Sequence, residues 1–584
     1  METNNRLETL EGEEYQLSVG EGTYQLRDSI ALGQPSLPHS EQQPPPPPNP
    51  LDTRIQAPMV GTRLSIILFG PKNGMTMAPK QIRPDSPIST GDNSSQTGSQ
   101  QDQQDSRSSN SISMFRGPDW GAEMLSGQKT QILGHDNPAL AQTNGKDTKD
   151  SRKAKKPKNN LVKTNSSFIQ RVLPADNLTK RLNDRNAEGL LVFANVNRAF
   201  QWLDLAASEK SQKADPLTKI LFAKAHALCH DVNQRTSNSS HIDFIMGFST
   251  GDIIWYDPIS QKYSRINKNG TINPNPVYDI KWIPGSPNLF IAAHSDGTLV
   301  VYDKEKEDQA FVAEHADVPD IDYNKPQLQI FKSIQSQNQK FNPVAFWRIA
   351  KQRINSFSFS PDAKVIAAGT EGGRLYLVDP HEEKITDLFL PLFGGIQAIC
   401  WSPDGRYILS GGQDDLVHLY SFDEKELVAR FQGHRGWVNC IAFDPWRCDG
   451  RNYRFGSVAD DRRLLLWDFN ASMLQRPRAV SIRQRTSVSS NIDLRTHSES
   501  VNARLASNAE LADRLHSNIE VGPDVGVHIA KGWNAAPKVP AIMDLQVDNH
   551  ELSWIGFHQQ GIITSCGKGH IRTWDRPQEH HSNV

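Results

Sequence analysis

Seven copies of one short sequence pattern predict an all-β fold, a seven-bladed β-propeller with a long disordered N-terminal region and a disordered insertion before the last blade. The copies recur at about the length of a four-stranded blade. Aromatic residues, which carry the largest buried area per side chain, gather where the copies lie. The mean hydropathy of the 584 residues is −0.57. So polar a chain is expected to hold long segments that do not fold alone.

Each copy is a turn of small residues with Asp or Gly, followed by an alternating strand that usually ends in an aromatic residue and Asp. The copies read FANVNRAFQWLD (193–204), GFSTGDIIWYDP (247–258), AAHSDGTLVVYDK (292–304), AAGTEGGRLYLVDP (367–380), SGGQDDLVHLYSF (410–422), GSVADDRRLLLWDF (456–469) and SCGKGHIRTWDR (565–576). Their closing positions are Asp204, Asp257, Asp303, Asp379, Ser421, Asp468 and Asp575. The spacings are 53, 46, 76, 42, 47 and 107 residues. The shorter ones are typical of WD40 repeats, and the two long ones fit one repeat plus a loop.

The sixth copy is the most complete, because Gly433 and His434 open it and Trp467 and Asp468 close it. A buried hydrogen-bonded set is expected to pin this blade. Its members are His434, Ser457, Asp460 and Trp467. A histidine in such a set has a structural role, which we favour over that of a catalytic base.

Domain organisation follows from where aromatic residues are scarce. Only five of the 46 aromatic residues lie in residues 1–165, which also contain the proline run 44–48. Such composition buries too little apolar surface to offset chain entropy. The expected divisions are a mostly disordered region (1–165), blades one to six (166–470), a disordered Arg/Ser-rich insertion (471–540), the last blade (541–577) and a tail (578–584).

Closure of the ring requires an additional outer strand for the last blade. In a WD40 blade the outer strand follows the closing Asp, but only nine polar residues follow Asp575. An unpaired sheet edge is unfavourable, so another segment must cover it. We expect residues 22–27 or 62–69 to supply the outer strand of the last blade.

The sequence offers no catalytic motif, cofactor site or metal site. Its cysteines contain no CxxC pair, and none has a histidine at a diagnostic spacing; they are Cys229, Cys400, Cys440, Cys448 and Cys566. The formal net charge of −2 gives no basis for direct nucleic-acid binding. No apolar run is long enough to span a membrane. We therefore expect a non-enzymatic protein of the cytoplasm, the nucleus or both.

The sequence signals for regulation are weaker than those for the fold. A basic cluster is either a nuclear-import signal or a solvated linker, and it consists of Arg152, Lys153, Lys155, Lys156 and Lys158. Ser481 and Ser487 lie beside arginines and are candidate phosphorylation sites.

Binding residues are expected in the loops at the ends of the propeller. Phe393 and Trp437 each lie in a loop that leads into an inner strand, 44 residues apart, so they should be neighbours on one rim. Buried aromatic residues dominate interface energies, which makes both candidate partner-binding residues. The alternative is that each packs on its own blade. Trp446 is a weaker third candidate.

Residues 393–422, followed by GHRGWVNCIAFDPW (433–446) and YRFGSV (453–458), closely resemble the WD repeat protein 20 family. SSFIQRVLPADNLTKRLNDR (166–185) resembles its filamentous-fungal branch, the catabolite-repression protein creC. The resemblance implies a non-catalytic partner that stabilises or activates a ubiquitin-specific protease of the creB type, with or without a second WD40 activator, in carbon catabolite repression. It also implies that Phe393 and Trp437 contact the protease.

Two other functions stay open. A substrate receptor of a cullin ubiquitin ligase would tend to carry Arg two residues after the closing pair, where Asn470 and Pro577 stand instead. A chromatin-associated scaffold would need a basic rim, which the charge balance does not promise.

Overall fold

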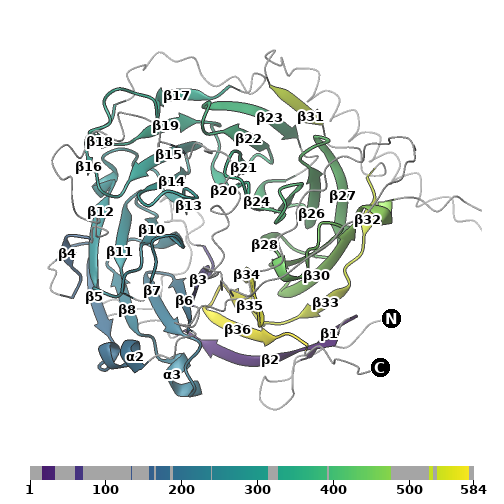
Figure 1. The fold of residues 1–584 in the computed structure, drawn as a ribbon, viewed down its shortest axis with the longest axis horizontal. Coiled ribbons are helices and arrows are strands. Elements are labelled where there is room, and N and C mark those ends of the chain that lie inside the picture. The colour runs from purple at the N-terminus through teal and green to yellow at the C-terminus, as the bar shows by residue number, and fades with distance from the viewer. Residues whose placement is uncertain are drawn as a thin grey trace, which may run out of the picture.

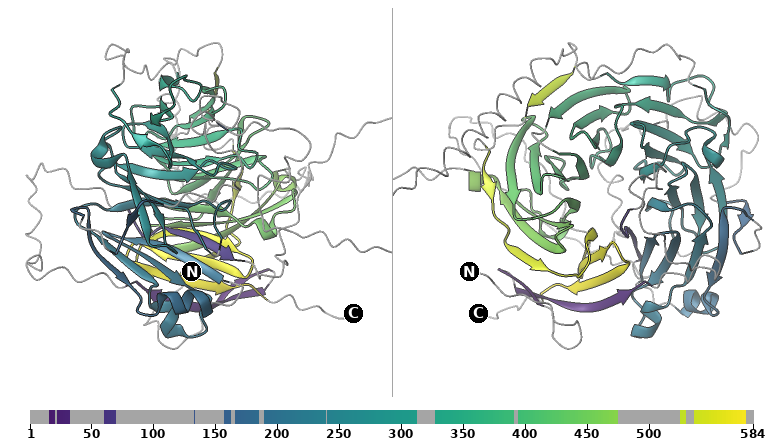
Figure 2. Two further views of the ribbon diagram at one scale, coloured as in Figure 1. Left: turned by 60° about the vertical axis from the view of Figure 1, so that its left-hand side comes forward. Right: turned by 180° about the vertical axis from the view of Figure 1, so that it is seen from behind.

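The structure is a computed structural model that describes residues 16–20, 22–32, 60–69, 133, 157–162, 166–184, 189–238, 240–312, 327–390, 394–474, 525–529 and 536–577. Within these ranges, seven sheets of four or five strands stand around a central channel (Figures 1 and 2). The predicted seven-bladed all-β propeller is therefore confirmed. All seven predicted closing residues lie in the third strand of a blade.

The blades are numbered here along the chain, and their strands are given from the channel outward. Blade 1 consists of β3 (Leu64–Phe69), β6 (Gly189–Val196), β7 (Ala199–Asp204), β8 (Thr218–Phe222) and β5 (Ile169–Pro174). Blade 2 consists of β9 (Ala227–Val232), β10 (Phe244–Phe248), β11 (Ile253–Asp257), β12 (Lys262–Ile266) and β4 (Asn159–Asn160). Blade 3 consists of β13 (Val277–Trp282), β14 (Leu289–His294), β15 (Thr298–Asp303), β19 (Ala345–Arg348) and β17 (Gln329–Lys332).

The remaining blades follow the same plan. Blade 4 consists of β20 (Ile354–Phe359), β21 (Ile366–Thr370), β22 (Leu375–Asp379), β23 (Lys384–Leu390) and β31 (Gly526–Ile529). Blade 5 consists of β24 (Ile396–Trp401), β25 (Tyr407–Gly412), β26 (Leu416–Ser421), β27 (Glu426–Gln432) and β32 (Lys538–Val539). Blade 6 consists of β28 (Val438–Phe443), β29 (Asn452–Ala459), β30 (Arg463–Asn470) and β33 (Met543–Gln546). Blade 7 consists of β34 (Leu552–His558), β35 (Gly561–Cys566), β36 (His570–Asp575), β2 (Gly22–Ala31) and β1 (Gln16–Val19).

Outside the blades, β16 (Glu307–Asp308) pairs with β18 (Phe341–Asn342), and two short helices, α2 (Leu178–Asp184) and α3 (Lys210–Ala214), lie beside blade 1 (Figure 1). No helix among the described residues is long and apolar enough to cross a membrane.

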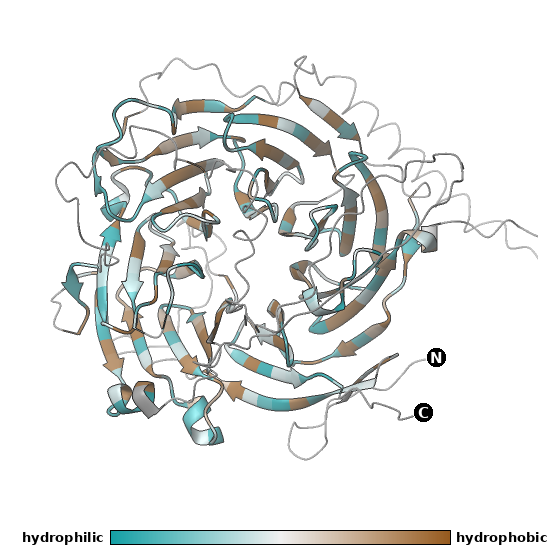
Figure 3. Cartoon of the chain, in the orientation of Figure 1, coloured by the Kyte–Doolittle hydropathy of each residue, from teal (hydrophilic) through white to brown (hydrophobic). Residues whose placement is uncertain are grey.

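The hydrophobic core lies between neighbouring sheets. Hydrophobic stretches run along the strands of every blade (Figure 3). Four tryptophans are fully buried, namely Trp202, Trp347, Trp467 and Trp574. Phe193 of blade 1 meets Phe244 of blade 2 with ring centroids 4.7 Å apart. Each blade buries its apolar faces against the next in this way around the ring.

Closure uses both N-terminal segments, in different blades. β2 pairs with β36, so the 22–27 segment covers the edge of the last blade, as one of the two alternatives predicted. The 62–69 segment instead forms β3, which pairs with β6 as the inner strand of blade 1. Lys213 of α3 fixes β2, because its Nζ lies 2.9 and 3.0 Å from the two oxygens of the buried Asp28.

The blade boundaries differ from the predicted ones at the insertion. Residues 525–529 and 536–546, which we call the strap, run along the outer edges of three blades in turn (Figure 1). β31 pairs in parallel with β23 of blade 4, β32 in parallel with β27 of blade 5, and β33 antiparallel with β30 of blade 6. Two strands thus lie within the stretch predicted to be disordered. The predicted start of the last blade, residue 541, also differs, because β33 is the outer strand that β30 needs.

Other expectations fall largely outside the described residues. These are the proline run, four of the five residues of the basic cluster, and Ser481 and Ser487. Lys158 is the described member of the cluster. It lies beside β12, with its Nζ 3.5 Å from the carboxylate of Glu307.

Candidate functional site

One rim of the propeller carries the loops that lead into the inner strands and the turns between the second and third strands; we call it the loop rim. Both kinds of loop come to the same end of a blade because successive strands are antiparallel. Trp437 directly precedes β28, and Gly395 directly precedes β24 of the neighbouring blade. Phe393 lies outside the described residues.

Trp437 presents its side chain to solvent. It is 49% exposed and is among the few large hydrophobic residues of the described ranges that are this exposed. Its backbone is nevertheless fixed, because its carbonyl accepts a hydrogen bond of 3.0 Å from the amide of Asp460. Gly436 allows this close approach, since a Cβ there would lie 3.0 Å from the amide nitrogen of Asp461. The rim therefore holds a large aromatic side chain on a well-anchored turn.

Acidic groups surround this turn. Asp460 accepts a hydrogen bond of 2.6 Å from Asn439. Burial raises the pKa of Asp460, and the nearby carboxylates of Glu551 and Asp461 raise it further. Burial also raises the pKa of Asp415 in blade 5, with Asp414 and Asp461 acting in the same direction. Carboxylates of blades 5, 6 and 7 thus repel one another along this rim.

The predicted hydrogen-bonded set of blade 6 is present with one correction. Trp467 donates from Nε1 to Ser457 Oγ at 2.8 Å, and Ser457 donates to His434 Nε2 at 2.7 Å. His434 Nδ1 then donates at 3.0 Å to Asp461, not to Asp460. Asp460 points instead to Asn439, because adjacent residues of the turn face opposite ways. A carboxylate can only accept here, so His434 Nδ1 carries a proton in this chain of bonds.

This set anchors the turn and offers no catalytic chemistry. Burial alone would raise the pKa of Asp461, but the bonds from His434 and from the amides of Arg435 and Arg463 lower it below the usual value. Asp461 therefore stays ionised and ties the loop before Trp437 to the turn after β29.

A second network holds Gly395, the residue directly before β24. Arg353 donates from Nη1 to the hydroxyl of Tyr278 at 3.0 Å and from Nη2 to Glu371 at 2.8 Å. Gln413 donates to the other oxygen of Glu371 at 2.9 Å and accepts from the amide of Gly395, also at 2.9 Å. These bonds connect blades 3, 4 and 5 and end two residues after Phe393.

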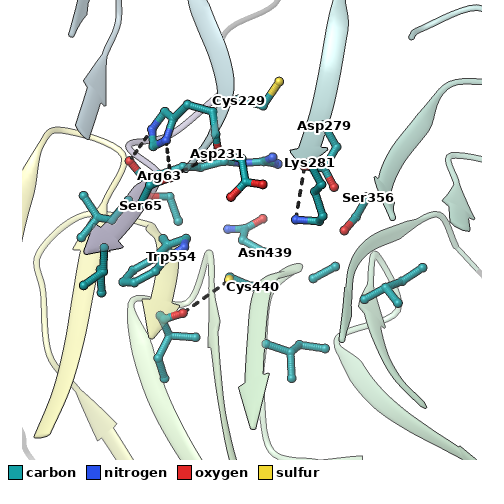
Figure 4. Close-up of a pocket in the computed structure, with 18 of the residues that line it drawn as sticks. Arg63, Ser65, Cys229, Asp231, Asp279, Lys281, Ser356, Asn439, Cys440 and Trp554 are labelled. Carbon is teal, nitrogen blue, oxygen red and sulfur yellow. Dashed lines mark hydrogen bonds and ion pairs between the residues drawn. The ribbon is translucent and has the colours of Figure 1, made fainter. Parts of the chain in front are cut away.

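The central channel contains a cavity of about 340 Å³. Its walls include Asp231, Asp279 and Lys281, together with Ser65 and Asn439 (Figure 4). Their fixed bonds join blades: Asp231 accepts from the amide of Trp282 at 2.8 Å, and Asp279 accepts from that of Phe357 at 2.9 Å.

A serine and a histidine meet beside this cavity. Ser65 Oγ lies 2.7 Å from His230 Nδ1, and His230 Nε2 lies 3.1 Å from the carbonyl of Arg63. Burial lowers the pKa of His230 to about 3. An imidazole that holds a proton so weakly is a poor general base, and the pair is better explained as the link between β3 and β9.

The five cysteines are all described, and none forms a disulfide. Burial raises the pKa of Cys448 to about 12, and it raises the pKa values of Cys229 and Cys400 further. These three cysteines therefore remain protonated thiols of the core. Trp446 lies in the turn between β28 and β29, on the rim opposite the loop rim, where the guanidinium of Arg576 covers its ring at 5.6 Å.

Trp437 could be identified from the sequence as an aromatic residue of the rim. The side-chain network that holds Gly395 on the same rim could not. The Tyr278, Arg353, Glu371 and Gln413 network joins three blades and has no local sequence signal. Only the position of Gln413 in a turn directly after a repeat strand could have indicated a role on this rim.

Three comparisons with known proteins found similar sequences or structures. The family model for the WD domain, G-beta repeat, matches residues 392–421 and 425–468. The UBP9-binding protein bun62 of Schizosaccharomyces pombe is 37% identical over 423 residues, which cover 70% of this chain and 75% of that protein. A chain in the crystal structure of a mitotic checkpoint complex aligns with a TM-score of 0.41 and 10% identity, over 74% of this chain and 99% of that one. The chain belongs to the same family of WD-repeat proteins as bun62.

Proposed function

We propose that this chain is a non-catalytic scaffold that binds a ubiquitin-specific protease through the loop rim around Trp437. The observation that carries the proposal is the 49% exposed indole of Trp437 on a turn fixed by Gly436 and Asp460. A rigid, exposed aromatic side chain is the usual centre of a protein interface. The description of bun62 as a UBP9-binding protein supports a protease of this class as the partner.

The mechanism would be differential binding. A scaffold activates an enzyme only if it binds the active conformation more tightly than the inactive one. A propeller suits this role because its loops project from a closed ring of sheets. Tighter binding to the folded protease than to its unfolded chain would also stabilise it.

We base the type of protease and the cellular process on the resemblance to creC. It makes the partner a creB-type protease, with or without a second WD40 activator, and the process the ubiquitin-dependent control of carbon catabolite repression. The place of action would be the cytoplasm, the nucleus or both.

Substitution of the two aromatic residues tests the interface. We expect Trp437→Ala and Phe393→Ala each to weaken co-purification with the protease by at least about tenfold, since a truncated hot spot costs about 2 kcal/mol. The midpoint of thermal unfolding should stay nearly unchanged. Ile529→Ala is the matched control, because Ile529 is 54% exposed but lies on the strap of blade 4. Undiminished binding by the double variant, with the fold intact, would refute the proposal.

A further inference from the structure

A group of metal-binding side chains lies on the loop rim of blade 7, next to the blade that carries Trp437. Asp548 precedes β34, Cys566 ends β35, and His570 begins β36. One ligand atom from each of the three lies within 4.8 Å of the others. The turn between β35 and β36 and the loop before β34 bring them together from segments 18 residues apart in sequence.

The donor atoms are largely buried, and one has no other use. Asp548 is 1% exposed and Cys566 0%. The amide of His570 donates to Cys566 Sγ at 3.4 Å, which holds the sulfur beside the imidazole. His570 Nδ1 is buried, has no hydrogen-bond partner among the described residues, and lies 3.6 Å from Asp548 Oδ2. A buried imidazole nitrogen without a partner, beside a thiol and a carboxylate, is an arrangement that a metal ion would complete.

His550 lies beside this group of three without belonging to it. The ring of His550 lies 5.4 Å from that of His570, centroid to centroid. The amide of His550 donates to Asp548 Oδ1 at 2.9 Å, so both residues belong to one tight turn. We propose that Asp548, Cys566 and His570 form a Zn²⁺ site and that His550 turns in as its fourth ligand, because one thiolate, two imidazoles and one carboxylate are a tetrahedral donor set suited to zinc.

Binding would need a small closure of the site. Ligand bonds of about 2.0–2.3 Å place tetrahedral donors about 3.3–3.8 Å apart. Asp548, Cys566 and His570 therefore have to approach one another by about 1 Å, and the side chain of His550 has to turn toward them. Cys566 loses its thiol proton to solvent as the Zn–S bond forms, so apparent affinity should rise with pH until the thiol is ionised.

A competing explanation is that the cluster has only a structural role in blade 7, equivalent to that of the hydrogen-bonded set in blade 6. Asp548 stands four residues before Leu552, as His434 stands four before Val438. Asp548 also forms a buried ion pair with Arg572 Nη1. That pair neutralises Asp548 without metal, but it leaves Cys566, His550 and His570 Nδ1 unexplained. With zinc bound, Arg572 would hold the carboxylate as an outer partner of the ligand.

Metal analysis of the full-length protein distinguishes a zinc site from a purely structural cluster. We expect about one zinc per chain by mass spectrometry after dialysis against metal-free buffer. After removal of zinc, Co²⁺ should produce the visible absorption of a tetrahedral site and a thiolate-to-cobalt charge-transfer band. Cys566→Ser and His570→Asn should lose at least about tenfold in zinc affinity. Cys448→Ser is the matched control, because Cys448 is a buried thiol near the opposite rim, and its zinc content should be unchanged.

Thermal unfolding measurements show whether each variant is folded and report zinc binding independently. Zinc should raise the unfolding midpoint of the apo protein, because a ligand that binds the folded state stabilises it. The folded Cys566→Ser protein should lose that increase. Absence of zinc together with no cobalt–thiolate band in the folded apo protein would overturn the proposal, as would equal zinc binding by Cys566→Ser.

Discussion

His241 lies between two carboxylates, with Nε2 3.1 Å from Asp243 and Nδ1 3.1 Å from Asp257. Lys304, from blade 3, reaches Asp243 at 2.7 Å. Burial alone would lower the pKa of His241, but the two carboxylates raise it to about 9. A raised folded-state pKa adds stability below the unfolded value of about 6.5, and this stability is lost as pH rises through 9. We expect unfolding free energy to fall by up to about 3 kcal/mol between pH 6 and pH 9.5. Denaturant titrations should show a much smaller fall for His241→Asn, and equal falls would contradict the assignment.

At the scale of elements, β2 is the strand on which closure depends. It covers the whole of β36, and its Tyr24 is fully buried. Removal of residues 1–32 would expose the backbone of β36 and open the core beneath it. We expect fast hydrogen exchange in β36, a lower unfolding midpoint and association between chains. Removal of residues 1–15 is the control, because β1 and β2 remain, and it should change none of these. Slow exchange in β36 without β2 would show that closure does not need this strand.

The whole molecule is held together by segments that cross between blades. The strap covers blades 4, 5 and 6, and the chain then enters blade 7. A cut within residues 475–524 would therefore leave two pieces joined by sheet pairing along four blades. We expect a protein with a protease site inserted after residue 500 to elute as one species after cleavage, with its unfolding midpoint within a few degrees of the uncut protein. Separation of the pieces without denaturant would refute this interlocked arrangement.

The ring was predictable because every blade repeats the strand that ends at its closing residue. The outer strands β31 and β32 could not be predicted, because segments of four and two residues are too short to show an alternating hydrophobic pattern. Asp460 and Asp461 are adjacent, and only the geometry of the turn decides which one meets His434. Trp437 was predictable as an exposed aromatic in a loop. The zinc ligands were not, because two distant turns each contribute a pair.

Closure by β2 also has a consequence for biosynthesis. Apart from β1, β2 is the first described strand to leave the ribosome, and its partner β36 is the last. During translation β2 therefore has an unsatisfied edge while the intervening blades assemble, which is the condition that favours chaperone binding or aggregation. The β1–β2 hairpin must therefore keep the free edge of β2 from pairing wrongly until the last blade is made.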